Sequence, residues 1–137
     1  MPLNGATHPV DELGGRRILL VEDEYFIAHD LKSALCGRGV HVVGPVPDLA
    51  GGLALARHEE LDAAVLDVNL GGEMSYPIAD ELGERGVPFL FTSGYDDATL
   101  NRAYCRVTLI EKPFDVEAVL AALIELVCGA EIRGAPS

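Results

Sequence analysis

Two apolar runs of this chain each end in carboxylates: ILLVED at residues 18–23 and AAVLD at residues 63–67. A short run that is apolar throughout is typical of a β-strand covered on both faces, as in a parallel sheet. A third, largely apolar run, VTLI at residues 107–110, is followed closely by Lys112. If the three runs are parallel strands of one sheet, their carboxyl ends share one edge, and the acidic residues and the lysine gather there.

Segments with helical periodicity alternate with five runs of this kind. The expected strands are residues 18–21, 40–43, 63–67, 89–92 and 107–110, and the expected helices are residues 26–35, 49–56, 77–86, 96–106 and 115–127. Asp48 and Asp115 are in position to cap two of the helices. Gly44 and Pro45 are expected to end the second strand, and residues 69–75 to form a glycine-rich loop. The alternation predicts an α/β fold, a doubly wound parallel sheet with right-handed crossovers and helices on both faces.

The composition fits one globular domain. With 137 residues, of which 49% are hydrophobic and 23% charged, the chain can bury a full core but has no room for a second domain. Residues 1–15 lack periodicity and are expected to form a flexible N-terminal arm, with the domain over residues 16–128 and a C-terminal tail over residues 129–137.

The charge and the cysteines narrow the function class. The net charge of -12 argues against direct nucleic-acid binding, which needs clustered lysine and arginine. The three cysteines show no disulfide or metal-site spacing, which favours thiols in a reducing compartment. No apolar run is long enough for a membrane span, and the N-terminus lacks the apolar core of a signal peptide. We therefore expect a cytoplasmic protein.

Carboxylates gathered at one sheet edge repel one another unless a cation lies among them. Unit charges about 4 Å apart interact by roughly 4 kcal/mol at an effective dielectric constant of about 20. Oxygen ligands of this kind suit Mg²⁺, which takes part of its coordination shell from water and from a phosphate. A carboxylate beside such an ion can act as a nucleophile and form an aspartyl-phosphate. The sequence therefore predicts magnesium-dependent phosphoryl chemistry.

The order of these residues resembles that of the receiver domains of bacterial response regulators. The matching positions are Glu22-Asp23, Asp67 followed by Asn69, a Ser or Thr after the fourth strand, and Lys112-Pro113-Phe114. The resemblance covers roughly residues 17–128. It implies a five-stranded sheet with the flavodoxin-like strand order 2-1-3-4-5 and a function in two-component signal transduction.

The resemblance also implies a role for each acidic residue. Asp67 would accept a phosphoryl group from a sensor histidine kinase or a phosphotransfer protein. Asp23 and Asp67 would bind Mg²⁺ directly, Glu22 would act through water, and the backbone carbonyl of Asn69 would be the third protein ligand. Lys112 would pair with a phosphoryl oxygen.

Two adjacent hydroxyl residues follow the fourth strand. The family's usual spacing from Pro88 indicates Ser93 as the hydroxyl that turns toward the phosphoryl group, and Thr92 is the alternative. The segment PFLFTSGY at residues 88–95 also resembles the Phe-Ala-Thr-Gly-Tyr signature of a subgroup of stand-alone receivers, with Thr-Ser in place of Ala-Thr. The family pattern further implies a cis peptide bond before Pro113.

One position departs from the family pattern. Many receivers carry an aromatic residue three positions before the lysine, where this chain has Leu109. Tyr95 and Tyr104 are the two aromatic residues that could take over its role, and the sequence does not choose between them.

Other readings of the same residues are open. Taken singly, Glu22 and Asp23 could cap a helix, Asp67 could be a loop residue and Lys112 a solvated surface lysine. Their order and register together favour a receiver, which is an interaction module and not an enzyme that turns over an external substrate. The alternatives are a Mg²⁺-dependent phosphohydrolase, for which the short chain leaves little room, and a pseudo-receiver that binds partners without phosphate. A receiver implies an unknown downstream protein target and a monomer or a phosphorylation-dependent homodimer.

Overall fold

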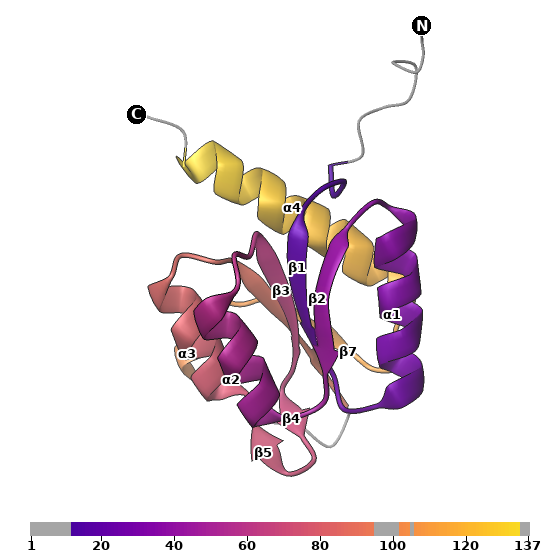
Figure 1. The fold of residues 1–137 in the computed structure, drawn as a ribbon, viewed down its shortest axis with the longest axis vertical. Helices are drawn as coiled ribbons and strands as arrows, with labels where there is room; N and C mark the ends of the chain where they lie inside the picture. Colours follow the sequence, from indigo (N-terminus) through magenta and orange to yellow (C-terminus); the bar gives the residue numbers. More distant parts are fainter. Residues whose placement is uncertain (1–11, 95–101, 105, 135–137) are drawn as a thin grey trace, which may run out of the picture.

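A five-stranded parallel sheet forms the centre of the computed structural model, which describes residues 12–94, 102–104 and 106–134 (Figure 1). The strands are β1 (Arg17–Val21), β2 (His41–Val46), β3 (Ala63–Asp67), β6 (Phe89–Ser93) and β7 (Leu109–Glu111). Their spatial order is β2-β1-β3-β6-β7, and every neighbouring pair is parallel. The predicted doubly wound sheet and its strand order 2-1-3-4-5 are therefore confirmed.

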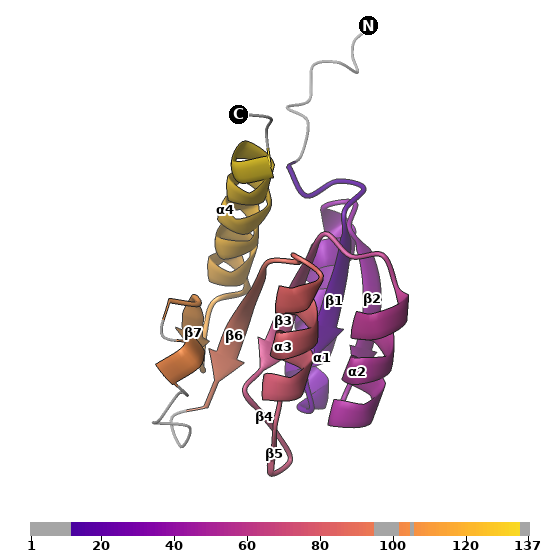
Figure 2. The same cartoon turned by 90° about the vertical axis from the view of Figure 1, so that its left-hand side faces the viewer.

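Helices cover both faces of the sheet. They are α1 (Tyr25–Gly37), α2 (Leu49–His58), α3 (Tyr76–Glu84) and α4 (Val116–Gly134). Figure 2 shows the sheet between α4 and the α2–α3 pair, and α1 packs with α4 on the same side. The helix expected over residues 96–106 falls mostly outside the described residues, and the part that is described contains a 3-10 turn, η1 (Arg102–Tyr104).

Alternating side chains of β1 divide the core between the two faces. Ile18 and Leu20 pack toward α1 and α4, whereas Leu19 and Val21 pack toward α2 and α3. All five residues of β3 are buried, as expected for a central strand of a parallel sheet. At Gly52 of α2, an added Cβ would lie 2.4 Å from Cδ1 of Ile78, so glycine permits the close approach of α2 and α3.

Capping follows the sequence in two helices. The backbone N–H of Glu117, in the first turn of α4, donates a hydrogen bond of 3.1 Å to Oδ1 of Asp115. The carboxylate of Asp48 accepts a hydrogen bond of 2.8 Å from the backbone N–H of Gly51, which satisfies one of the open donors at the start of α2. Among the described residues, no helix combines the length and apolarity that a membrane crossing requires.

The second strand and the loop after β3 differ from the expectation. Strand β2 does not end at Gly44-Pro45 but continues to Val46, because β2 is an edge strand, where a residue without an N–H is tolerated. The segment expected to be a loop at residues 69–75 contains a short hairpin, β4 (Asn69–Leu70) and β5 (Glu73–Met74). Gly71 and Gly72 both have positive φ, at +64° and +103°, which a two-residue hairpin turn requires.

The folded region extends along the sequence beyond both predicted domain boundaries, residues 16 and 128. Leu13 is fully buried, and Gly15 donates a backbone hydrogen bond of 2.8 Å to Gly39, so the domain begins within the predicted arm. Helix α4 runs to Gly134 through most of the predicted tail at residues 129–137. A single glycine at residue 129 does not end the helix, because glycine costs only about 1 kcal/mol in a helix interior.

Candidate functional site

Three carboxylates meet at the carboxyl ends of β1 and β3. Glu22 and Asp23 directly follow β1, and Asp67 is the last residue of β3, the neighbouring strand. One oxygen atom from each of the three residues lies within 4.8 Å of the others. The shared sheet edge thus brings together side chains that are far apart in the chain.

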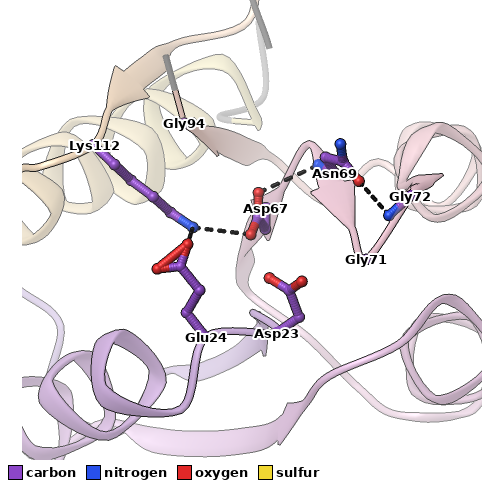
Figure 3. Close-up of a pocket in the computed structure, with 8 residues that line it drawn as sticks. All are labelled: Asp23, Glu24, Asp67, Asn69, Gly71, Gly72, Gly94 and Lys112. Carbon is purple, nitrogen blue, oxygen red and sulfur yellow. Dashed lines mark hydrogen bonds and ion pairs between the residues drawn. The ribbon is translucent and has the colours of Figure 1, made fainter. Parts of the chain in front are cut away.

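Lys112 lies among these carboxylates. It follows β7, and its backbone N–H donates a hydrogen bond of 2.7 Å to the carbonyl of Ser93, which fixes it to the end of β6. Its Nζ lies 2.9 Å from Asp67 Oδ2 and 3.3 Å from Glu24 Oε1 (Figure 3). The same atom lies 3.0 Å from Glu22 Oε2. The Lys112 side chain is only 9% exposed, so its ion pairs with the buried Glu22 and Asp67 are largely shielded from water, whereas the pair with the exposed Glu24 is not.

The peptide bond that follows Lys112 also has the form that the family pattern implies. The bond between Lys112 and Pro113 is cis. A second cis bond, which we did not predict, joins Gly44 to Pro45 in β2.

The crowding changes the acidity of Asp67 and Lys112. Burial raises the pKa of Asp67 to about 8, the negative charge of Glu22 acts in the same direction, and the hydrogen bond from Lys112 acts in the opposite one. For Lys112, burial lowers the pKa, but the hydrogen bonds to Asp67 and Glu22 outweigh this and hold the pKa above its ordinary value. Burial and the negative charge of Glu22 therefore both favour the protonated form of Asp67.

An open hollow of about 250 Å³ lies over this cluster (Figure 3). It is lined by Asp23, Glu24, Asp67, Asn69, Gly71, Gly72, Gly94 and Lys112. The β4–β5 hairpin forms one wall. There the backbone N–H of Asn69 donates to Asp67 Oδ1 at 3.2 Å, and the N–H of Gly72 donates to Asn69 Oδ1 at 2.6 Å.

The chemistry of the donor set fits a hard divalent cation. Glu22 is 3% exposed, and among the described residues its Oε1 atom has no hydrogen-bond partner. A buried carboxylate oxygen without a partner is costly, and a cation with its bound water would provide one. The oxygen atoms of Glu22, Asp23 and Asp67 are therefore suited to hold such an ion together.

The two candidate hydroxyls are both buried at the end of β6. Thr92 pairs in register with Asp67, is 0% exposed, and has no partner for its Oγ1 within the described part of the chain. Ser93 pairs with Glu111 and is 2% exposed. Neither residue lines the hollow, which Gly94 reaches instead. The choice between Ser93 and Thr92 therefore stays a prediction.

Tyr104 packs against α3. Its ring stacks on Tyr76 with centroids 5.1 Å apart and contacts Phe91 edge-on at 5.6 Å, and its hydroxyl donates to Asp80. Burial and the neighbouring carboxylate raise the pKa of Tyr104. Leu109, by contrast, is 37% exposed. Tyr95, the other aromatic candidate, lies outside the described residues.

Sequence reasoning missed Glu24 as part of the site. Its carboxylate contacts Lys112 and lines the hollow. The only signal in the sequence is that Glu24 is the third acidic residue in a row after β1.

Comparisons with known proteins agree with this geometry. No family model matches the chain. The two-component response regulator PhoP of Pseudomonas aeruginosa is 31% identical over 112 residues, which is 78% of this chain and 49% of PhoP. The chain spans 49% to 61% of the length of the curated relatives that it matches.

The similar solved structures include proteins of comparable size. SdrG from Sphingomonas melonis Fr1 is 39% identical with a TM-score of 0.74, over 85% of this chain and 98% of SdrG. A BeF3-activated conformation of SdrG has also been solved, and this chain is 40% identical to it. A CheY-like receiver domain protein from Methanospirillum hungatei JF-1, at 21% identity, shares the fold with a TM-score of 0.75, over 87% of this chain and 98% of that protein. The chain belongs to the receiver-domain family of two-component response regulators.

Proposed function

We propose that this chain is a receiver that accepts a phosphoryl group on Asp67 in a Mg²⁺-dependent reaction. The donor would be the phosphohistidine of a sensor histidine kinase or of a phosphotransfer protein. The phosphorylated state would change which proteins the receiver binds. One observation carries the proposal: Asp67, Asp23 and Lys112 meet beneath an open hollow.

The arrangement supplies what phosphoryl transfer needs, which is a nucleophile and positive charge near the transferred group. An oxygen of Asp67 forms the new bond to phosphorus while the bond from phosphorus to the donor nitrogen breaks. The imidazole nitrogen keeps the electron pair of that bond. Lys112, whose Nζ lies 2.9 Å from Asp67, is positioned to pair with a phosphoryl oxygen.

The residues that would hold Mg²⁺ are Glu22, Asp23, Asp67 and the backbone carbonyl of Asn69. Mg²⁺ would neutralise charge that develops on the phosphoryl oxygens. Because burial and Glu22 raise the pKa of Asp67 to about 8, a nearby cation would also favour the ionised carboxylate that must attack phosphorus.

Switching would follow from contacts that exist only in the phosphorylated state. A phosphoryl group on Asp67 offers new hydrogen-bond acceptors to Lys112 and to a hydroxyl of β6, Ser93 by our assignment. Such differential contact shifts a population between two conformations. We place the protein in the cytoplasm, as a monomer or a phosphorylation-dependent homodimer, with a downstream protein as its target.

The test is intact mass spectrometry after incubation with acetyl phosphate and Mg²⁺. We expect one added phosphoryl group on the wild type, and none on Asp67→Asn or on wild type in EDTA. An unchanged wild-type mass would favour a pseudo-receiver. Rapid turnover of a generic phosphomonoester such as p-nitrophenyl phosphate would favour a phosphohydrolase.

A further inference from the structure

Glu24 is tied to the site at both its backbone and its side chain. Its backbone N–H donates a hydrogen bond of 3.0 Å to Oε2 of Glu22, and its Oε1 lies 3.3 Å from Nζ of Lys112. The Glu24 side chain is 57% exposed, whereas the Glu22 side chain is 1% exposed. Figure 3 shows Glu24 and Asp67 on two sides of the Lys112 ammonium group, and Glu24 lines the hollow.

The Glu24 side chain contacts Lys112 and does not cap helix α1. Glu24 is the N-cap residue of α1, where a carboxylate is favoured by the open N–H groups of the first turn. Its side chain makes no capping hydrogen bond to the described residues of that turn. The side chain extends to Lys112, which makes Glu24 part of the phosphoryl site and not a helix cap.

Glu24 is also the carboxylate in excess. Among the described residues at the site, three carboxylates pair with the ammonium group of Lys112, those of Glu22, Glu24 and Asp67, and Asp23 is the fourth carboxylate of the cluster. A divalent cation and Lys112 together carry three positive charges, which balance Glu22, Asp23 and Asp67. The charge of Glu24 stays unbalanced, on the lining of the hollow that an anionic phosphoryl donor would enter.

We infer that Glu24 is a specificity-determining residue of this site, which slows transfer from small, highly charged phosphodonors. It does so by repelling the donor anion and by competing with the phosphoryl oxygens for Lys112. The inference rests on the proposed phosphoryl transfer to Asp67. The negative charge of Glu24 favours a donor that carries positive charge near its phosphoryl group, such as a phosphohistidine flanked by basic side chains.

The test compares two small donors of different charge. Acetyl phosphate carries about two negative charges at neutral pH and phosphoramidate about one. Rates of phosphorylation are measured on the full chain at saturating Mg²⁺ by intact mass, for the wild type and Glu24→Gln. Glu84→Gln is the matched control, because Glu84 is an exposed glutamate at the end of α3, remote from the hollow. Urea unfolding confirms that the variants are folded.

We expect Glu24→Gln to react about three to ten times faster with acetyl phosphate, with a smaller gain for phosphoramidate. The gain should shrink as the salt concentration rises from about 0.05 M to about 0.5 M, because Glu24 is exposed and its charge is screened. Glu24→Asp, which keeps the charge, should react at close to the wild-type rate, and Glu84→Gln should be unchanged.

Three results would overturn the inference while phosphorylation of the wild type is intact. The first is an equal gain in the phosphorylation rate of Glu24→Gln with both donors. The second is a Glu24→Gln phosphorylation rate equal to that of Glu84→Gln. The third is a Glu24→Asp phosphorylation rate as fast as that of Glu24→Gln. If neither donor phosphorylates the wild type, the proposed function fails and this inference falls with it.

Discussion

Replacing Asp67 by asparagine is expected to stabilise the protein in the absence of metal. Burial and the charge of Glu22 raise the pKa of Asp67 from 3.8 to about 8 in the folded state. One pKa unit corresponds to about 1.4 kcal/mol, so at pH 7 the raised pKa reflects a penalty of about 4 kcal/mol against folding. The asparagine side chain would remove this penalty but also the charge-assisted hydrogen bond from Lys112, in a hollow open to solvent. We therefore expect a net gain of about 1–3 kcal/mol.

The sign of the pH dependence follows from the direction of the shift. Because the folded pKa of Asp67 lies above the unfolded value, the penalty is absent below about pH 4, grows as the pH rises and levels off above about pH 8. The stability difference between Asp67→Asn and wild type should therefore widen between about pH 5 and pH 8.

Urea unfolding in EDTA, followed by circular dichroism, measures the difference. Asp30→Asn, which removes an exposed carboxylate of α1, is the control and should change stability by less than about 0.5 kcal/mol. In saturating Mg²⁺ the wild type should be more stable than Asp67→Asn, because only the wild type keeps all the carboxylate ligands of the metal. An Asp67→Asn variant that is less stable than wild type in EDTA at pH 7, with an unchanged control, would refute the charge-crowding argument.

Three further predictions follow from the same site. The affinity for Mg²⁺ should rise about tenfold from pH 6 to pH 7, because the proton held by Asp67 must leave before the metal binds; a flat profile in calorimetric titrations would count against this. Lys112→Met should destabilise the metal-free protein by about 2–4 kcal/mol, because the carboxylates of Asp67 and Glu22 lose their shared cation. The loss of stability should be smaller when Mg²⁺ is bound. Equal losses with and without Mg²⁺ in urea unfolding would contradict it. Ser93→Ala should leave phosphorylation largely intact but reduce the amide chemical-shift changes that phosphorylation causes. Thr92→Ala should leave those chemical-shift changes as they are in the wild type. The reverse pattern would assign the switch to Thr92.

The sheet and the carboxylate cluster could be predicted because both follow from strong local patterns. A central strand such as β3 is buried on both faces, so its sequence is apolar at every position up to Asp67. Residues that follow neighbouring parallel strands must share one edge, which brings Glu22 and Asp23 to Asp67. The strand order came from the resemblance to a family, since periodicity alone does not order strands.

Features that depend on tertiary contacts could not be predicted in the same way. The direction of the Glu24 side chain is set by Lys112, 88 positions later in the chain. Leu13 is buried because the segment before β1 packs on the core. The two glycines that follow Leu13 indicate a loop, so the sequence pattern does not predict this packing. The β4–β5 hairpin has only two residues in each strand, too few for an alternating pattern, so its glycine pair reads as a loop.

Locating the phosphoryl group along the chain tests the role of Asp67 most directly. After phosphorylation with acetyl phosphate and Mg²⁺, reduction with sodium borohydride converts an aspartyl-phosphate to homoserine, and peptide mass spectrometry identifies the residue. We predict homoserine at position 67 and at no other aspartate. Homoserine at a different aspartate, or a phosphoryl group carried by another residue type, would contradict the assignment of Asp67.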